Sequence, residues 1–224
     1  HTPMSPALYG ELVDQGFRRS GDNIYRPACS GCDDCIPLRV PTGRFQPRRA
    51  QRRIWRNLEE LRVVGRPAEF DSEHFRLYRR YINARHGSGP MASPSELQYM
   101  QFLVCDWVDT LFFEIRRGNR LLAVAVTDLL PQGFSAVYTF FEPELESLSP
   151  GVFALLWQID EARRRRLPWL YLGFWIPGCK KWNIRASTAR FRHISRAAGM
   201  NLVPGNRSNV RHENPETLAL SRFF

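Results

Sequence analysis

Three cysteines at two-residue gaps are the part of this sequence best suited to chemistry. Cys29, Cys32 and Cys35 lie in the segment GFRRSGDNIYRPACSGCDDCIPLR, residues 16–39. Thiolates at this spacing are soft ligands for Zn²⁺ or an iron–sulfur cluster, and both normally take four ligands. The segment supplies three, so two interpretations stay open. The cysteines hold a metal or cluster together with a ligand from elsewhere, or they are three reduced thiols in a tight loop.

Positive charge surrounds this segment and dominates the chain. The 224 residues carry 32 Lys and Arg against 22 Asp and Glu, a formal net charge of +10. Such an excess concentrates polyanions near the protein surface and speeds their encounter with it. Nucleic acid is therefore the expected partner class, and a basic protein without such a partner is the alternative. The run at residues 163–166 has a further explanation, since cations at a helix end interact favourably with the helix dipole.

The apolar content places the protein among folded, globular chains. Apolar residues make up 43% of the sequence, but no apolar stretch approaches the roughly 20 residues needed to cross a bilayer. The first residues, HTPMSPALYG, lack the apolar core of a secretion signal. We therefore expect a cytoplasmic protein without a membrane partner. Its five cysteines are expected to stay reduced there rather than form disulfides.

Regular spacing of apolar residues begins after residue 70. FDSEHFRLYRRYINARH (70–86) and SPSELQYMQFLV (93–104) predict helices, the second with Ser93 as its cap. β-branched and aromatic residues then predict three antiparallel strands, a helix and a further strand. These elements are expected at 110–118, 120–130, 134–143, about 150–166 and 168–176. By pattern alone, this order indicates an α/β (α+β) protein with a mixed sheet.

Composition also divides the chain into regions. Residues 1–57 are punctuated by Pro, Gly and Cys and predict a small, loop-rich module that contains cysteine. Residues 58–69 are polar, contain Pro and predict a connection. Residues 70–181 are then expected to form the main domain, and 182–224 a divergent tail.

Four further segments match one family of sequences in order and spacing. Together with residues 16–39 they are QRRIWRN (51–57), LYRRYINARHGSGPM (77–91), AVAVTDLLPQGFSAVYTFFEPE (123–144) and YLGFWIPGCKK (171–181). The chain resembles the bacterial aminoacyl-tRNA–protein transferases, which add leucine or arginine to proteins that begin with Asp or Glu. The resemblance implies a GNAT-like acyltransferase domain with a mixed, largely antiparallel sheet. It also implies Leu-tRNA as the donor, because short bacterial members of this kind are leucyltransferases, and a role in N-degron protein degradation.

The reaction that the resemblance implies needs no cofactor for its chemistry. An aminoacyl-tRNA is already an ester, so the α-amine of the acceptor attacks it without ATP. The site must supply a neutral amine, whose free pKa is ~7.7–8, close placement and support for the oxyanion. Candidates to orient or deprotonate the amine are Asp128, Tyr138, Thr139 and Glu142, with ordinary structural roles in a sheet as the alternative.

Arginines are expected to hold the substrates. A guanidinium can pair with an RNA phosphate, or bidentately with the acidic side chain of the acceptor. The candidates are Arg18, Arg19, Arg26, Arg48, Arg49, Arg52 and Arg53, and the alternative for the group is a solvated basic face. His86, beside a glycine-rich turn, is a further candidate as a substrate-binding residue or proton carrier.

Three other functions are weighed against the leucyltransferase. The first is an arginyl-tRNA–protein transferase, which the sequence does not separate from it. The second is a GNAT-type N-acetyltransferase, which the segment SLSPGVF (147–153) disfavours because one glycine cradles a pyrophosphate poorly. The third is a non-catalytic RNA-binding protein, which would not need an aromatic pocket. The aromatics that could form such a pocket, or plain core, are Phe112, Phe113, Phe140, Phe141, Trp157 and Trp175.

The resemblance stops after Lys181. The family continues there with Met, any residue and Tyr, whereas this chain reads WNIRASTARFRHIS (182–195). Loss of one adenine beside the lysine codons would produce this switch, because restoring it converts Trp-Asn into Met-Glu. We therefore expect residues 182–224 to be a frameshifted tail that packs poorly and lowers activity, with a divergent C-terminus as the alternative. Related sequences also carry a cysteine ahead of His1, so we expect a truncated N-terminus.

Overall fold

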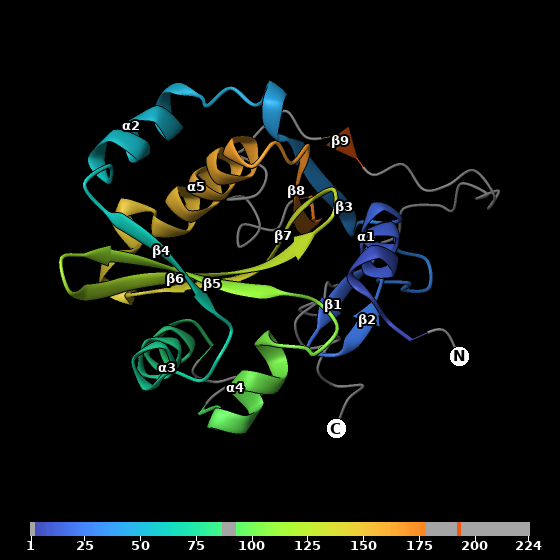
Figure 1. Cartoon of the computed structure of the whole chain (residues 1–224), viewed down its shortest axis with the longest axis horizontal. Helices are drawn as coiled ribbons and strands as arrows, with labels where there is room; N and C mark the ends of the chain where they lie inside the picture. The colour runs from blue at the N-terminus through green and yellow to red at the C-terminus, as the bar shows by residue number, and fades with distance from the viewer. Residues whose placement is uncertain (1–2, 87–92, 178–191, 194–224) are drawn as a thin grey trace.

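A seven-stranded sheet in the order β4-β5-β6-β7-β8-β3-β9 runs through the molecule (Figure 1). The computed structural model describes residues 3–86, 93–177 and 192–193. Every neighbouring pair in this sheet is antiparallel except β7 and β8, which are parallel. The predicted mixed, largely antiparallel sheet is therefore confirmed. Its strands are β3 (Ile36–Pro41), β4 (Arg62–Pro67), β5 (Thr110–Arg117), β6 (Arg120–Leu130), β7 (Gly133–Phe141), β8 (Trp169–Trp175) and β9 (Arg192–His193).

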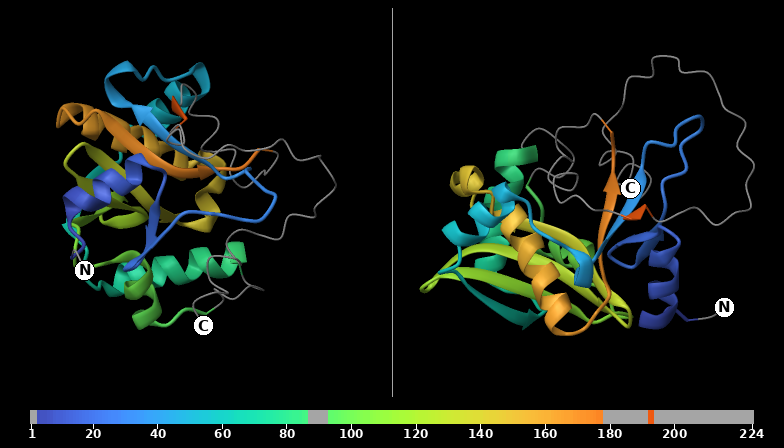
Figure 2. Two further views of the ribbon diagram at one scale, coloured as in Figure 1. Left: turned by 90° about the vertical axis from the view of Figure 1, so that its right-hand side faces the viewer. Right: turned by 90° about the horizontal axis from the view of Figure 1, so that it is seen from above.

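Helices cover the sheet on both faces. Helices α2 (Arg49–Asn57) and α5 (Pro150–Arg164) lie over one face, and α3 (Ser72–His86) and α4 (Glu96–Leu103) lie over the other (Figures 1 and 2). Helix α5 buries residues at the 3- and 4-residue steps of an amphipathic helix, so its apolar stripe packs against the strands. The sheet therefore lies between two apolar layers. This packing holds the polar side chains of its strands in fixed positions.

The N-terminal region contributes strand β3 to this sheet and also forms a separate two-stranded sheet of its own. It contains helix α1 (Pro6–Asp14), the hairpin β1 (Arg18–Ser20) and β2 (Asn23–Tyr25), and the short helix η1 (Thr42–Arg44). Strand β3 pairs along its whole length with β8. Backbone hydrogen bonds therefore join the predicted module 1–57 to the predicted main domain. A second short helix, η2 (Pro143–Leu148), leads into α5.

The structure differs from the sequence-based expectations at two places, and a third expectation falls outside the described residues. Residues 58–69, expected to be a connection, contain strand β4, which pairs with β5 at the edge of the sheet. Helix α4 is capped by Ser95, whose Oγ accepts a hydrogen bond from the Gln98 amide at 3.2 Å, and not by Ser93. Residues 182–224, expected to be a frameshifted tail, lie outside the described residues apart from β9, which pairs with β3. Within the described ranges, no helix has the length and apolar character that a membrane crossing requires.

Candidate functional site

The parallel strands β7 and β8 part soon after they meet. They pair at three positions, from Gly133 opposite Trp169 to Ser135 opposite Tyr171, and β7 then continues to Phe141. The first contact is so close that a Cβ on Gly133 would lie 2.3 Å from the Trp169 carbonyl oxygen, which explains the glycine there. In the part of the chain that the structure describes, no strand pairs with β7 on this side beyond Ser135.

A β-bulge lies where the two strands separate. On the other side of β7, Val126 of β6 pairs with Tyr138 and Thr127 pairs with Ala136, so Val137 is the extra residue. Bulges re-aim side chains and are common beside active sites. Backbone N–H groups that face away from β6 here have no ladder partner among the described strands, so they can donate to a bound carbonyl oxygen. The geometry therefore favours acyl chemistry at this opening.

Helix α5 begins beside the far end of β7. A Cβ on Gly151, in the first turn of α5, would lie 3.6 Å from the Phe141 ring. The first turn of a helix carries unpaired N–H groups and a partial positive charge. This end of the helix therefore adds a field that favours negative charge near the opening.

Tyr138 and Thr139, two of the predicted catalytic residues, follow the bulge directly. Tyr138 is half-buried, and its ring lies 5.3 Å from the ring of Phe102 and 6.2 Å from that of Tyr78. These contacts fix the ring on the side of the sheet that α3 and α4 cover. Thr139 is also half-buried, and as the next residue of the strand it points to the opposite face of the sheet.

Glu142, the third predicted catalytic residue, ends β7 and is bound by an arginine that the sequence did not single out. Arg80 of α3 donates to both of its carboxylate oxygens, from Nη2 at 2.6 Å and from Nε at 3.2 Å. The Glu142 side chain is largely buried, whereas that of Arg80 is half-exposed. Arg80 therefore occupies both carboxylate oxygens of Glu142, and the pair joins α3 to the residue that follows β7.

Asp128, the fourth predicted catalytic residue, is part of a buried ion pair. Arg19 Nε donates to Asp128 Oδ2 at 2.7 Å and Arg19 Nη2 donates to Oδ1 at 2.5 Å, and both side chains are excluded from solvent. Thr110 Oγ1 donates to the same Oδ1 at 2.8 Å. Both carboxylate oxygens are therefore occupied, and this contact joins the β1–β2 hairpin to β6 rather than facing a substrate.

Arg18 is buried as well, contrary to the expectation that it faces RNA. Its Nη1 donates to Ser135 Oγ at 3.1 Å, and its Nη2 has no hydrogen-bond partner among the described residues. Burial lowers the pKa of Arg18. The prediction that Arg18 and Arg19 face RNA is therefore wrong, because the short hairpin strands place both guanidinium groups in the interior, where they bind Ser135 and Asp128. Arg26 does reach the surface, where it lies over the Phe17 ring.

The three clustered cysteines lie in the loop between β2 and β3. Cys29 is exposed, while Cys32 and Cys35 are half-buried. Burial, and the neighbouring Cys29 and Cys32, raise the pKa of the Cys35 thiol to about 11. Within the described ranges, no group of three or more His, Cys, Asp or Glu side chains is placed to hold a metal ion.

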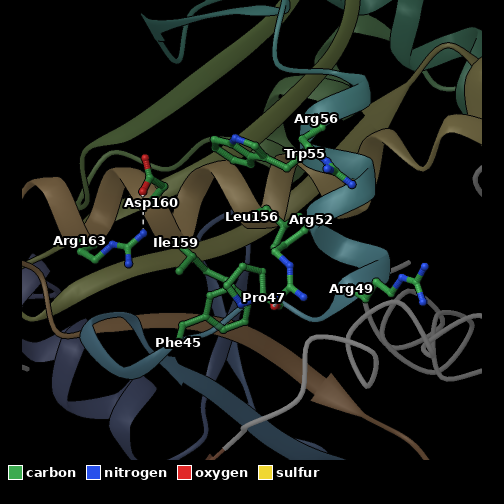
Figure 3. Close-up of a pocket in the computed structure, with 10 residues that line it drawn as sticks. All are labelled: Phe45, Pro47, Arg49, Arg52, Trp55, Arg56, Leu156, Ile159, Asp160 and Arg163. Atoms are coloured by element: carbon green, nitrogen blue, oxygen red, sulfur yellow. Dashed lines mark hydrogen bonds and ion pairs between the residues drawn. The ribbon is translucent and has the colours of Figure 1, made fainter.

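A second feature is a pocket of about 560 Å³ between α2 and α5 (Figure 3). It brings together two of the predicted arginines, Arg49 and Arg52, with two that were not predicted to act here, Arg56 and Arg163. Arg48 and Arg53 are exposed nearby but do not line it. The apolar and acidic lining residues are Phe45, Pro47, Trp55, Leu156, Ile159 and Asp160.

Most of the aromatic residues proposed to form a pocket belong to the core. Phe112, Phe113, Phe140 and Phe141 are buried between the sheet and its helices. Trp157 and Trp175 are half-buried, and the Trp157 ring lies 4.7 Å from that of Phe113. His86 ends α3, and its side chain is outside the described part of the structure. Arg80 and Trp55 both lie in segments that match the family. The sequence alone did not reveal the residues that they contact, Glu142 and Phe153.

Comparison with known proteins identifies the family of this chain. The family models described as "Arginine-tRNA-protein transferase" match residues 1–53 (N terminus) and 73–190 (C terminus). An aspartate/glutamate leucyltransferase from Alcanivorax borkumensis is 54% identical over 182 residues, which is 81% of this chain and 75% of that protein. One from Pseudomonas putida (strain W619) is 52% identical over 183 residues, or 82% of this chain and 78% of that protein.

The fold also occurs in a solved structure of low sequence identity. A C-terminal DUF2156 domain from Agrobacterium fabrum superimposes with a TM-score of 0.50 at 12% identity, over 77% of this chain and 52% of that one. This likeness concerns the fold alone, whereas the two family matches and the identities above 50% concern descent. The chain therefore belongs to the aminoacyl-tRNA–protein transferase family, whose curated members include these leucyltransferases.

Proposed function

We propose that this protein transfers leucine from Leu-tRNA to the N-terminal amine of proteins that begin with Asp or Glu. Family membership supports the substrate classes, because its relatives are named for leucine transfer to aspartate and glutamate. The observation that carries the chemistry is the separation of β7 from β8 at the bulge, which leaves backbone donors available beside half-buried polar side chains.

The reaction proceeds at the ester carbonyl of the donor. The neutral α-amine of the acceptor attacks this carbon, a C–N bond forms, and the C–O bond to the terminal ribose breaks. The proton lost by the amine ends on the ribose oxygen that leaves. Because the ester is already activated, no cofactor is consumed. Backbone N–H groups of β7 beyond the bulge stabilise the oxyanion of the tetrahedral intermediate.

Tyr138 and Thr139 are the side chains proposed to orient the acceptor amine. They follow the bulge and are half-buried, so they can meet a substrate while the sheet holds them in place. Their hydroxyl groups can accept a hydrogen bond from the amine and return one to the leaving oxygen. Glu142, through its contact with Arg80, fixes the end of the strand that carries them.

Exposed arginines of α2 are proposed to contact the tRNA. Arg48, Arg49, Arg52 and Arg53 all reach the surface within two turns, and Arg26 adds charge elsewhere. Such contacts release condensed counterions, so binding should weaken as salt is added. A tRNA partner supports the expected cytoplasmic location.

The test is incorporation of labelled leucine by the purified chain. Leu-tRNA is supplied with peptides that differ in their first residue, Asp or Ala, and a parallel series supplies Arg-tRNA. We expect label in the Asp peptide with Leu-tRNA and little in the other combinations. Equal label in the Asp and Ala peptides would refute the acceptor assignment, and transfer from Arg-tRNA alone would refute the donor.

A further inference from the structure

We infer that the pocket between α2 and α5 binds a nucleotide, with its base on the apolar floor and its phosphate on the arginines of the rim. The pocket combines two kinds of surface that a nucleotide also combines. Its floor is formed by Phe45, Trp55, Leu156 and Ile159, and its rim by arginines from both helices (Figure 3). A base stacks on aromatic and apolar surface, and guanidinium groups bind phosphate.

The rim carries unneutralised positive charge. Arg49 and Arg56 are exposed and make no ion pair within the described part of the chain. Arg163 is held by Asp160, whose Oδ1 accepts from Arg163 Nη2 at 2.8 Å. Four arginines therefore face one carboxylate, and that carboxylate is already engaged by Arg163 and by Arg164. An anion is the ligand that this arrangement favours.

The pocket is built before any ligand arrives. The start of α2 is fixed because the buried side chain of Gln51 accepts from the Arg48 amide at 2.8 Å. Arg52 donates to the Pro47 carbonyl at 2.6 Å, which holds the loop that enters the helix. Trp55 packs against Phe153, with 5.5 Å between the ring centroids. Helix spacing then places Arg49, Arg52 and Arg56 along one exposed side of α2, at the rim of the pocket.

Size and shape favour a nucleotide over a simple anion. The volume, about 560 Å³, lies within the ~300–1,000 Å³ typical of small-molecule sites. Phosphate alone would leave the apolar floor in water, and an apolar ligand alone would leave Arg49 and Arg56 without an anionic partner. A base joined to a phosphate uses both surfaces.

A neighbouring pocket extends the site along the end of α5. It has a volume of about 450 Å³, shares Arg163 with the first, and is lined also by Arg44 and Arg166. These arginines could take the phosphate of an adjoining nucleotide. The ligand is therefore either a nucleotide within an RNA strand or a free nucleotide, and the first source rests on the proposed function.

The experiment measures binding without catalysis, so its failure is distinct from a failure of leucyl transfer. Calorimetry on the purified chain at fixed salt uses AMP, inorganic phosphate, the RNA trinucleotide CCA and uncharged tRNA as probes. The variants are Arg49→Ala, Arg56→Ala and Trp55→Leu. The matched control is Arg62→Ala, which removes the same charge from an exposed position of the edge strand β4, outside the pocket.

We expect AMP and CCA to bind at least tenfold more tightly than phosphate. Arg49→Ala and Arg56→Ala should weaken AMP binding about tenfold or more, Trp55→Leu should weaken AMP but not phosphate, and Arg62→Ala should leave AMP binding within twofold of the parent. If tRNA displaces AMP, the natural ligand is RNA, and if it does not, the ligand is a free nucleotide; both results support the site. Equal affinity for AMP and phosphate, equal losses in Arg62→Ala and Arg49→Ala, or binding of tRNA without AMP or CCA would each overturn it.

Discussion

Arg19 and Asp128 form a bidentate ion pair that lies wholly inside the protein, with donor–acceptor distances of 2.7 and 2.5 Å. Arg19 also donates from Nη2 to the Leu103 carbonyl at 2.9 Å, so one guanidinium ties the β1–β2 hairpin to β6 and to the end of α4. Each charge is satisfied by the other and by neutral groups around it. Loss of one member should therefore lower the stability of the fold more than loss of both.

Asp128→Ala should destabilise the fold by about 3–5 kcal/mol, because it leaves the Arg19 charge buried and uncompensated. The double variant Arg19→Met/Asp128→Leu should be more stable than Asp128→Ala, since it removes both charges. Urea denaturation of the three proteins measures the difference. An Asp128→Ala protein that folds as stably as its parent but loses transfer activity would restore the catalytic role predicted from sequence.

Tyr138→Phe should lower kcat for leucyl transfer by about 100-fold, within the range that positioned proton-transfer groups contribute. The substitution keeps the ring packing against Phe102 and removes the hydroxyl group. Tyr99→Phe is the matched control, because the Tyr99 hydroxyl is buried and has no hydrogen-bond partner among the described residues. Steady-state kinetics at saturating Leu-tRNA should show an unchanged rate for the control. A Tyr138→Phe rate equal to the parent's would remove this hydroxyl from the mechanism.

Glu114 should contribute to loss of stability in acid. Burial alone would raise its pKa, but hydrogen bonds from Arg116 and His74 outweigh burial and lower the pKa of the folded state. A lowered folded pKa gives stability that is present above the unfolded value of ~4.3 and is lost as pH falls below it.

The variant Glu114→Gln should therefore be less stable than the parent at pH 7 and should lose less stability between pH 5 and about pH 3. Urea midpoints measured across that range test the difference. Glu146→Gln serves as the control, since that side chain is exposed and pairs with Arg85 only at 3.4 Å. A Glu114→Gln protein with the parent's acid dependence would contradict the prediction.

Cys35 should react slowly with iodoacetamide at pH 7.5. Burial and the adjacent cysteines raise the pKa of its thiol to about 11, so little of the reactive thiolate is present. Cys29 is exposed and should be alkylated first. Mass spectrometry of peptides after timed labelling gives the rate at each position. Cys35 labelling as fast as that of Cys29, or full protection of both by added Zn²⁺, would contradict the arrangement described here.

Sequence patterns predicted the elements whose signal is local. The strands at 110–118 and 120–130 were found because β-branched and aromatic residues fill them, and the structure places β5 and β6 there. Strand β4 was missed because RVVGRP is short and polar and contains Gly and Pro, as an edge strand tolerates. Its place in the sheet comes from pairing with β5, a tertiary contact.

The candidate site was predictable in its residue types but not in its partners. Arg19 and Asp128 were both singled out, yet as separate groups facing substrates, because a pattern treats each charge as exposed unless its partner is near in sequence. Their actual pairing joins residues more than a hundred positions apart. The pocket beside α2 was missed for the same reason, since Phe45 and Ile159 meet only when α5 packs under α2.

The pairing of β3 with β8 has a consequence for biosynthesis. Strand β3 leaves the ribosome early, but the strand that flanks it along its whole length is among the last described segments to be made. Until β8 emerges, β3 has an open edge and the cysteine loop before it has no sheet to anchor it. Contacts between such distant segments slow folding, and unpaired edges invite aggregation. A nascent chain stalled before residue 169 should therefore depend on chaperones for its solubility.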